Sequence, residues 1–252
     1  MEAPDKNLVK KRFSRGLNTY SEAAVIQRDM AEKLTGMILS RQRVFRRILE
    51  IGAGTGILSG LMEDQLIWEE RMINDLAEDC APVHADRANT IFLCGDAETV
   101  DWGNEPFDLI CSNAAFQWLA DLPVFLKKLR KSLNSRGLLA FTSFGPENLK
   151  ELTLLTGNSL PYHPIRQISS WLADSGFTVL EAVEEKHVRK FDDPLDILKQ
   201  MRQTGVTASA DKSWWTPRRL AAFRRNYREY FGTPDGKVQL NWNPIYILAK
   251  VS

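Results

Sequence analysis

Three glycines alternate within residues 50–56, in a stretch that reads EIGAGTG and follows an apolar run. Glycine adopts backbone angles that other residues avoid, and it lets a ligand approach the main chain closely. A phosphate-binding loop would continue with Lys-Ser or Lys-Thr, which is absent here. A dinucleotide loop would place its third glycine at position 57, which is Ile57. The spacing therefore argues against a phosphate loop and weakens, without excluding, a dinucleotide site.

Three carboxylates accompany this loop. Glu50 stands two residues before the first glycine, Asp75 ends an expected strand, and Asp96 follows the next one. In open α/β sheets, ligands bind at the carboxyl ends of the strands, so these acids should gather at one edge. A carboxylate repels a pyrophosphate but attracts an ammonium or sulfonium group. The constellation predicts a site for a cationic nucleoside.

The elements that must position these residues alternate between short apolar runs and amphipathic stretches. Strands are expected at 47–51, 71–76, 90–96, 107–113, 138–144, 177–191 and 243–252. Helices are expected at 56–66, 122–133, 165–176, 194–205 (ended by Gly205) and 216–232. This alternation predicts an α/β fold with a doubly wound, mostly parallel sheet. Two further segments, 6–46 and 192–236, are predicted to be helical and to lie outside this alternation of strands and helices.

The composition is that of an ordinary globular protein, with 44% hydrophobic and 26% charged residues in 252. No apolar stretch is long enough to span a membrane, and residues 1–13 lack the apolar core of a signal peptide. The three cysteines show no metal-ligand spacing with each other or with the histidines. We expect a cytoplasmic protein without a metal site.

The net charge of +1 conceals a segregation along the chain. Residues 1–47 carry a net +6, residues 48–185 a net −12, and residues 186–230 a net +6. Two explanations remain open at this point. The basic segments are solvated helix faces, or they meet an acidic partner that long-range attraction steers into place.

The glycine loop resembles that of the class I S-adenosylmethionine-dependent methyltransferases, whose motif E/D-x-G-x-G-x-G is matched throughout residues 50–56. The resemblance covers roughly residues 44–144 and implies a seven-stranded, mostly parallel, Rossmann-like sheet with helices on both faces. It implies that S-adenosyl-L-methionine is the cofactor, with Glu50 and the glycines near its methionine part, Asp75 on the ribose and Asp96 near the adenine amino group. The cofactor-binding residues implied in full are Glu50, Gly52, Gly54, Gly56, Asp75, Leu76, Asp96, Ala97 and Asn113.

A second resemblance extends over nearly the whole chain. The stretches 12–34, 112–118 (SNAAFQW) and 191–206 are similar to segments of the malonyl-[acyl-carrier protein] O-methyltransferases of biotin synthesis. Ala53 departs from that pattern, in which a cysteine is common. The resemblance implies one methyltransferase domain over 1–252: a helical lid (1–46), the Rossmann-like core (47–191), a helical lid insertion (192–236) and a final strand (237–252).

The implied reaction is methylation of the free carboxylate of malonyl-acyl-carrier protein or malonyl-CoA. A carboxylate is ionised at neutral pH, so no general base is needed. We expect Tyr20 and Trp118 to form pocket walls, and Lys199 or Arg202 to bind the malonyl carboxylate. An acidic carrier protein is expected to dock on a basic patch in the second lid, formed by Arg218, Arg219, Arg224, Arg225 and Arg228.

Three other functions remain open. A methyltransferase of the same fold could act on another small-molecule carboxylate or on carbon. A nucleic-acid methyltransferase would use the basic segments on phosphate. A non-catalytic protein would bind the cofactor without turning it over. We expect neither a nucleic-acid nor a membrane partner.

Overall fold

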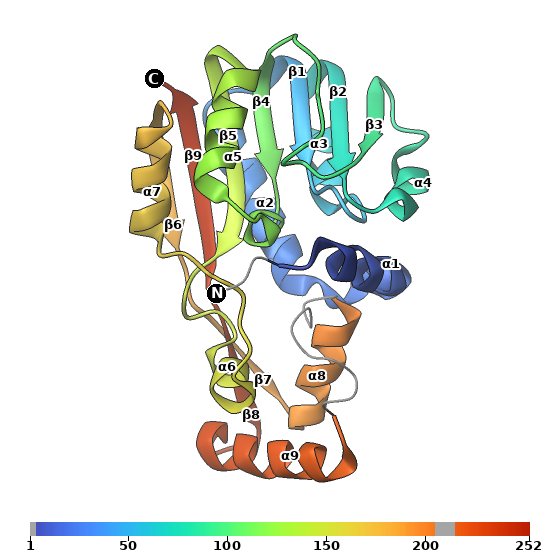
Figure 1. Ribbon diagram of the computed structural model, residues 1–252, viewed down its shortest axis with the longest axis vertical. Helices are drawn as coiled ribbons and strands as arrows, with labels where there is room; N and C mark the ends of the chain where they lie inside the picture. The colour runs from blue at the N-terminus through green and yellow to red at the C-terminus, as the bar shows by residue number, and fades with distance from the viewer. Residues whose placement is uncertain (1–3, 205–214) are drawn as a thin grey trace.

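A computed structural model describes residues 4–204 and 215–252 of the chain. Its main sheet has the strand order β3-β2-β1-β4-β5-β9-β6, and a second sheet pairs β7 with β8 (Figure 1). The strands are β1 (Val44–Ile51), β2 (Ile67–Asp75), β3 (Thr90–Cys94), β4 (Phe107–Ser112), β5 (Leu133–Phe144), β6 (Phe177–Glu184), β7 (His187–Phe191), β8 (Val238–Trp242) and β9 (Pro244–Val251). The predicted seven-stranded, mostly parallel, Rossmann-like sheet is confirmed.

The first five strands in this order run parallel to one another, and β9 inserts antiparallel between β5 and β6. Alternate residues of a strand point to opposite faces, and the core divides accordingly. Ile48 belongs to one buried cluster and Leu49 to the other. The carboxyl ends of β1 to β4 therefore lie side by side at one edge, where the three acids were expected.

Helices cover both faces of the sheet. They are α1 (Lys6–Ala23), α2 (Val25–Leu39), α3 (Ile57–Gln65), α4 (Ala81–His84), α5 (Leu122–Ser132), α6 (Lys150–Thr156), α7 (Ile165–Asp174), α8 (Pro194–Gln203) and α9 (Pro217–Phe231). Apolar residues of α2 and α3 share the cluster of Ile48, and those of α5 and α7 share the cluster of Leu49. Three of the helices begin with a proline in the first turn behind a side-chain cap, supplied by Asp121, Asp193 and Thr216.

The long strand expected at 177–191 is two strands. β6 stays in the main sheet beside β9, and β7 leaves it to pair with β8. The break is opposite Asn243, which separates β8 from β9. The Asn243 side chain donates to Glu184 Oε1 at 3.0 Å and to the main-chain oxygen of Glu185 at 2.9 Å. This amide therefore bonds to the chain at the point where the pairing of β6 with β9 ends and the pairing of β7 with β8 begins.

The N-terminal helical segment is also shorter than expected, since β1 begins at Val44 rather than after residue 46. Helix α1 lies across the carboxyl edge of the sheet, and α8 packs beneath it (Figure 1). A Cβ on Gly16 of α1 would stand 2.9 Å from the main-chain oxygen of Gln203 in α8, which shows how closely the two helices approach. Gly205, the predicted end of α8, lies outside the described residues. Within 4–204 and 215–252, no helix is both long and apolar enough to cross a membrane.

Candidate functional site

The glycine loop connects β1 to α3 at the carboxyl edge. Gly52, Gly54 and Gly56 have φ angles of 68°, 53° and 79°, in the left-handed region that side chains disfavour. A Cβ on Gly52 would stand only 2.4 Å from the Cβ of Ala115. Glycine at position 52 therefore lets the loop after β1 approach the segment after β4.

Asp75 holds this loop from the end of β2. It is 7% exposed, its Oδ2 accepts a hydrogen bond from the Gly54 N–H at 2.8 Å, and its Oδ1 accepts one from the Ala77 N–H at 2.8 Å. Burial raises the pKa of Asp75 above its ordinary value, against the opposing effect of these backbone donors. A residue predicted to bind ligand thus also fixes the glycine loop against the next strand.

Glu50 supplies a buried carboxylate beneath the loop. It is 1% exposed, and its Oε2 accepts a hydrogen bond from the Ser59 hydroxyl at 2.6 Å. Its Oε1 has no hydrogen-bond partner in the described part of the chain. Burial raises the pKa of Glu50 to about 7, although the Ser59 hydrogen bond lowers it. An unpartnered buried carboxylate oxygen is costly, so the site fits a ligand that brings a cationic or N–H donor to it.

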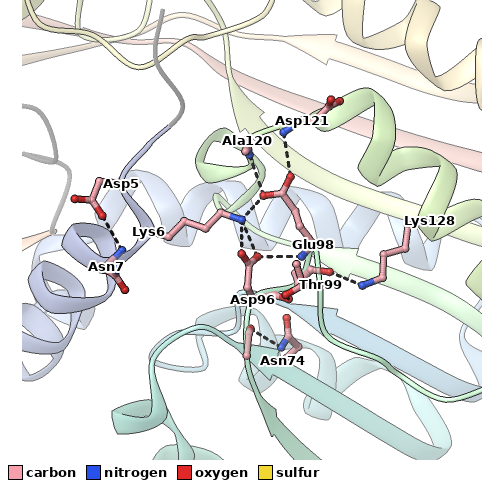
Figure 2. Close-up of polar contacts among 12 residues, drawn as sticks. Asp5, Lys6, Asn7, Asn74, Asp96, Glu98, Thr99, Ala120, Asp121 and Lys128 are labelled. Carbon is pink, nitrogen blue, oxygen red and sulfur yellow. Dashed lines mark hydrogen bonds and ion pairs between the residues drawn. The ribbon is translucent and has the colours of Figure 1, made fainter.

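Asp96 is engaged by the first residue of α1. The Lys6 ammonium lies 2.7 Å from Asp96 Oδ1 and 2.6 Å from Oδ2, and it also bonds to Glu98 (Figure 2). Glu98 in turn accepts the main-chain N–H groups of Ala120 and Asp121, each at 3.0 Å. Partial burial alone would lower the pKa of Lys6, but the hydrogen bonds to the two carboxylates outweigh it and raise that pKa. This cluster attaches α1 to the strand ends.

Replacing Lys6 with methionine should loosen the start of α1, since the methionine keeps the apolar stem but loses both ion pairs. We expect amide hydrogen exchange within 6–23 to accelerate about fivefold, the effect of losing two partly exposed pairs. Lys11→Met is the matched control because Lys11 lies exposed on the same helix. Equal exchange in the two variants would show that the cluster does not hold α1.

A cavity lies between α1 and the carboxyl edge, with a volume of about 1370 Å³ including the part open to solvent. Every residue predicted to bind the cofactor lines it except Gly56. Gly56 instead turns the chain into α3, and a Cβ there would stand 2.7 Å from Arg87 Nη2.

The predicted substrate residues separate into two groups. Tyr20 and Trp118 line the cavity, and the Tyr20 ring packs edge-on against Phe13 at 5.0 Å between centroids. Burial, with a smaller effect of the Asp75 charge, raises the pKa of Tyr20. Lys199 and Arg202 lie on the exposed side of α8 and do not line the cavity, so their role in binding a carboxylate stays a prediction without support from the geometry.

The predicted carrier-protein patch lies on α9, at the end of the molecule away from the main sheet (Figure 1). All five arginines are exposed. Arg224 and Arg228 both form ion pairs with Asp193, at 2.5 and 2.9 Å. From the described part of 192–236, only Thr204 lines the cavity. Helix α1 therefore covers the cavity, and α9 is separated from it.

The cavity has a second end that the sequence did not reveal. Beyond the glycine loop it is lined by Phe144, Asn148, Leu160, Tyr162 and Trp242. These residues come from three separate segments, and none carries a local motif. Trp242 is the last residue of β8, just before Asn243, where the strands change sheets. At this position it lines the cavity. Lys6 was likewise missed, because a lysine in the first turn of a basic helix has no distinguishing signal.

Comparison with known proteins agrees with this geometry. A family model described as a methyltransferase domain matches residues 23–182. A malonyl-[acyl-carrier protein] O-methyltransferase of Porphyromonas gingivalis is 35% identical over 248 residues, covering 98% of this chain and 96% of the relative. One from Chlorobium luteolum is 37% identical over 250 residues, covering 96% and 94%. The solved N-methyltransferase NodS of Bradyrhizobium japonicum, in complex with S-adenosyl-L-homocysteine, shares the fold with a TM-score of 0.56 at 12% identity, over 93% of this chain and 98% of that one.

Proposed function

This chain belongs to the malonyl-[acyl-carrier protein] O-methyltransferase family, and on that premise we propose that it methylates the free carboxylate of a malonyl thioester. The thioester is carried by acyl-carrier protein or by coenzyme A. The product is a methyl ester in which the negative charge is masked, and the reaction is an early step of biotin synthesis.

One observation carries the proposal: a single cavity joins the glycine loop and Glu50 to a second, aromatic end, and no histidine lines its described part. An amine or hydroxyl acceptor has a proton to lose, for which a positioned base such as histidine is the common solution. A carboxylate acceptor has already lost its proton at neutral pH. The site is therefore suited to aligning an ionised acceptor. Methyl transfer to malonyl-acyl-carrier protein, with acetyl-acyl-carrier protein as the control, tests this.

S-adenosyl-L-methionine is the cofactor, and when bound it supplies a methyl group whose bond to sulfur breaks as its bond to the carboxylate oxygen forms. Glu50 would hold the ammonium of the methionine part through the Oε1 atom that has no protein partner. Asp75 would hold the ribose hydroxyls, and Asp96 the adenine amino group. Leu76, Ala97 and Asn113 would complete the contacts from the neighbouring strand ends.

Aromatic side chains of α1 cover the glycine loop at this site. Phe13 lies directly over the loop, since a Cβ on Gly54 would stand 2.9 Å from its ring. Tyr20 packs against Phe13 and lines the same cavity. Attack of a carboxylate on a cationic methyl donor neutralises two charges, so replacing water by a fixed, apolar cover favours the reaction.

The acidic carrier protein would approach the arginines of α9. Arg218 and Arg225 have no ion pair with another described residue, unlike Arg224 and Arg228. The charges of Arg218 and Arg225 are therefore available to an acidic partner protein. Rim charges of this kind act mainly by steering association.

Reversing both charges, Arg218→Glu with Arg225→Glu, should raise the KM for malonyl-acyl-carrier protein about tenfold at low salt and remove most of its salt dependence. The kinetics with malonyl-CoA should stay unchanged, because it lacks the carrier surface. Arg43→Glu is the control, since Arg43 is exposed just before β1, at the amino end of that strand and away from α9. A carrier-protein KM that does not respond would remove α9 from the docking surface.

The remaining expectations belong to the same proposal. A malonyl thioester on acyl-carrier protein or coenzyme A requires neither a nucleic-acid nor a membrane partner, and a cytoplasmic location suits it. The whole chain would act as one methyltransferase domain, because α1 and β8 both supply residues to the cavity of the Rossmann-like core.

A further inference from the structure

Two residues that line the second end of the cavity each carry a hydrogen-bond donor with no acceptor among the described residues. The first is the hydroxyl of Tyr162, and the second is the indole N–H of Trp242. Both rings pack against Phe144, with centroid separations of 6.4 Å for Tyr162 and 5.9 Å for Trp242. Both also line the cavity. They come from the segment before α7 and from the end of β8, and only the fold brings them to the same wall.

The hydrogen bonds around Asn148 determine what the Tyr162 hydroxyl can do. Asn148 is 1% exposed, and its Oδ1 accepts the main-chain N–H of Asn243 at 3.1 Å. Its Nδ2 must therefore face Tyr162, and it donates to the phenolic oxygen at 2.9 Å. The Tyr162 oxygen is thus an acceptor toward Asn148, and its own proton remains to be donated. No described residue accepts that proton.

The second donor is more deeply buried. Trp242 is 1% exposed, and its Nε1 has no hydrogen-bond partner among the described residues. Buried indole N–H groups usually have an acceptor, because a buried donor without a hydrogen bond carries a free-energy penalty. Trp242 lines the same cavity as Glu50, whose Oε1 lacks a donor. A ligand that satisfies these groups must carry a hydrogen-bond donor near the glycine loop and hydrogen-bond acceptors at the second end of the cavity.

We propose that the Tyr162 hydroxyl and the Trp242 indole N–H bind the carboxylate of the acceptor through two hydrogen bonds from uncharged donors. This assignment rests on the proposed function, since it identifies where the malonyl group of that reaction is held. It takes the place of the clamp by Lys199 or Arg202 that the sequence suggested, both of which are exposed and outside the cavity.

Uncharged donors suit this reaction. Of the cations that line the described cavity, Lys6 is already paired with Asp96 and Glu98, and Lys10 lies exposed on α1. Two neutral donors can orient a carboxylate without cancelling the charge that is consumed on methylation. Burial raises the pKa of Tyr162 to about 12, against the lowering effect of Asn148, so its hydroxyl stays a donor. A methyl ester is a weaker acceptor than a carboxylate, so the same two groups release the product.

The test compares Tyr162→Phe and Trp242→Phe, which remove one donor each and keep an aromatic ring. Matched controls are Tyr227→Phe and Trp102→Phe. The Tyr227 hydroxyl donates to the main-chain oxygen of Gln239 at 2.9 Å, and Trp102 Nε1 is buried without a partner, but neither residue lines the cavity. Each variant is measured for kcat/KM with malonyl-CoA and, in the presence of S-adenosylhomocysteine, for calorimetric binding of malonyl-CoA and of its methyl ester.

We expect each cavity variant to bind malonyl-CoA about tenfold more weakly, the effect of losing a hydrogen bond to a charged group, with S-adenosylhomocysteine affinity unchanged. The preference of the wild-type protein for malonyl-CoA over the methyl ester should shrink in parallel, and the controls should keep it. Unchanged malonyl-CoA binding, or a parallel loss of S-adenosylhomocysteine affinity, would overturn the assignment. If the wild-type protein neither binds nor methylates malonyl thioesters, the proposed function itself fails.

Discussion

Glu50→Gln is expected to weaken S-adenosylmethionine binding about ten- to a hundredfold at pH 8, because it removes the charge from a buried oxygen that no described residue satisfies. The substitution keeps the shape of the side chain and the acceptor for the Ser59 hydroxyl. The same change should raise the thermal stability of the ligand-free protein. Binding and stability should therefore move in opposite directions.

The pH dependence follows from the pKa of Glu50, which burial raises from 4.5 to about 7. Because the folded state holds the proton more tightly than the unfolded state, the contribution of Glu50 to stability is fully present below pH 4.5 and is lost as the pH rises through 7. The gain in Tm of Glu50→Gln should thus be small at pH 5 and largest at pH 8. Cofactor affinity of the wild-type protein should improve over the same interval, relative to the variant.

Calorimetric titration and thermal unfolding between pH 5 and 8 measure both effects. Glu151→Gln is the matched control, because Glu151 is 0% exposed and lies outside the cavity. Its two carboxylate oxygens accept the main-chain N–H and the side-chain amide of Asn241. That variant should lose stability and keep its cofactor affinity. A Glu50→Gln protein with wild-type affinity at pH 8 would remove Glu50 from the binding site.

Gly52→Ala is expected to reduce cofactor affinity at least about a hundredfold, because its Cβ would stand 2.4 Å from the Cβ of Ala115. Relief of that clash requires the glycine loop or the segment after β4 to move, and both line the cavity. Fluorescence or calorimetric titration with S-adenosylmethionine measures the loss. Gly60→Ala in α3 is the control, since a Cβ there meets nothing within 4 Å.

Adding Ala115→Gly to Gly52→Ala should restore much of the affinity, because the second change removes the clashing methyl group. The double variant should remain about tenfold weaker than wild type, since the left-handed φ of 68° costs an alanine roughly 1–2 kcal/mol. A double variant no better than Gly52→Ala would mean that the backbone conformation, and not the approach of Ala115, requires glycine here.

The sequence was most informative where local pattern and local structure coincide. Alternating apolar runs located the strands of the main sheet, and the glycine spacing located the loop after β1, since each depends on neighbouring residues. The strand expected at 177–191 was wrong because its break depends on Asn243, which lies far away in the chain. A pattern among neighbouring residues cannot predict a hydrogen bond to a residue so far along the chain.

The same reasoning explains the residues at the site that the sequence missed or misplaced. Lys6 reaches Asp96 across 90 positions. Tyr162 bonds to Asn148 and, like Trp242, packs against Phe144, although these residues come from three segments. Lys199 and Arg202 were chosen for their charge on an expected lid, but α8 turns both toward solvent while it packs on α1. Charge along a helix does not by itself determine which side faces a cavity.

The most direct measurement is mass spectrometry of malonyl-acyl-carrier protein and acetyl-acyl-carrier protein after incubation with the protein and S-adenosylmethionine. We expect the malonyl form alone to gain one methyl group, fragmentation to place this group on the terminal carboxylate, and S-adenosylhomocysteine to appear in equal amount. Methylation of the acetyl form, or no transfer by a protein that binds the cofactor, would contradict the assignment of a malonyl carboxylate as the acceptor.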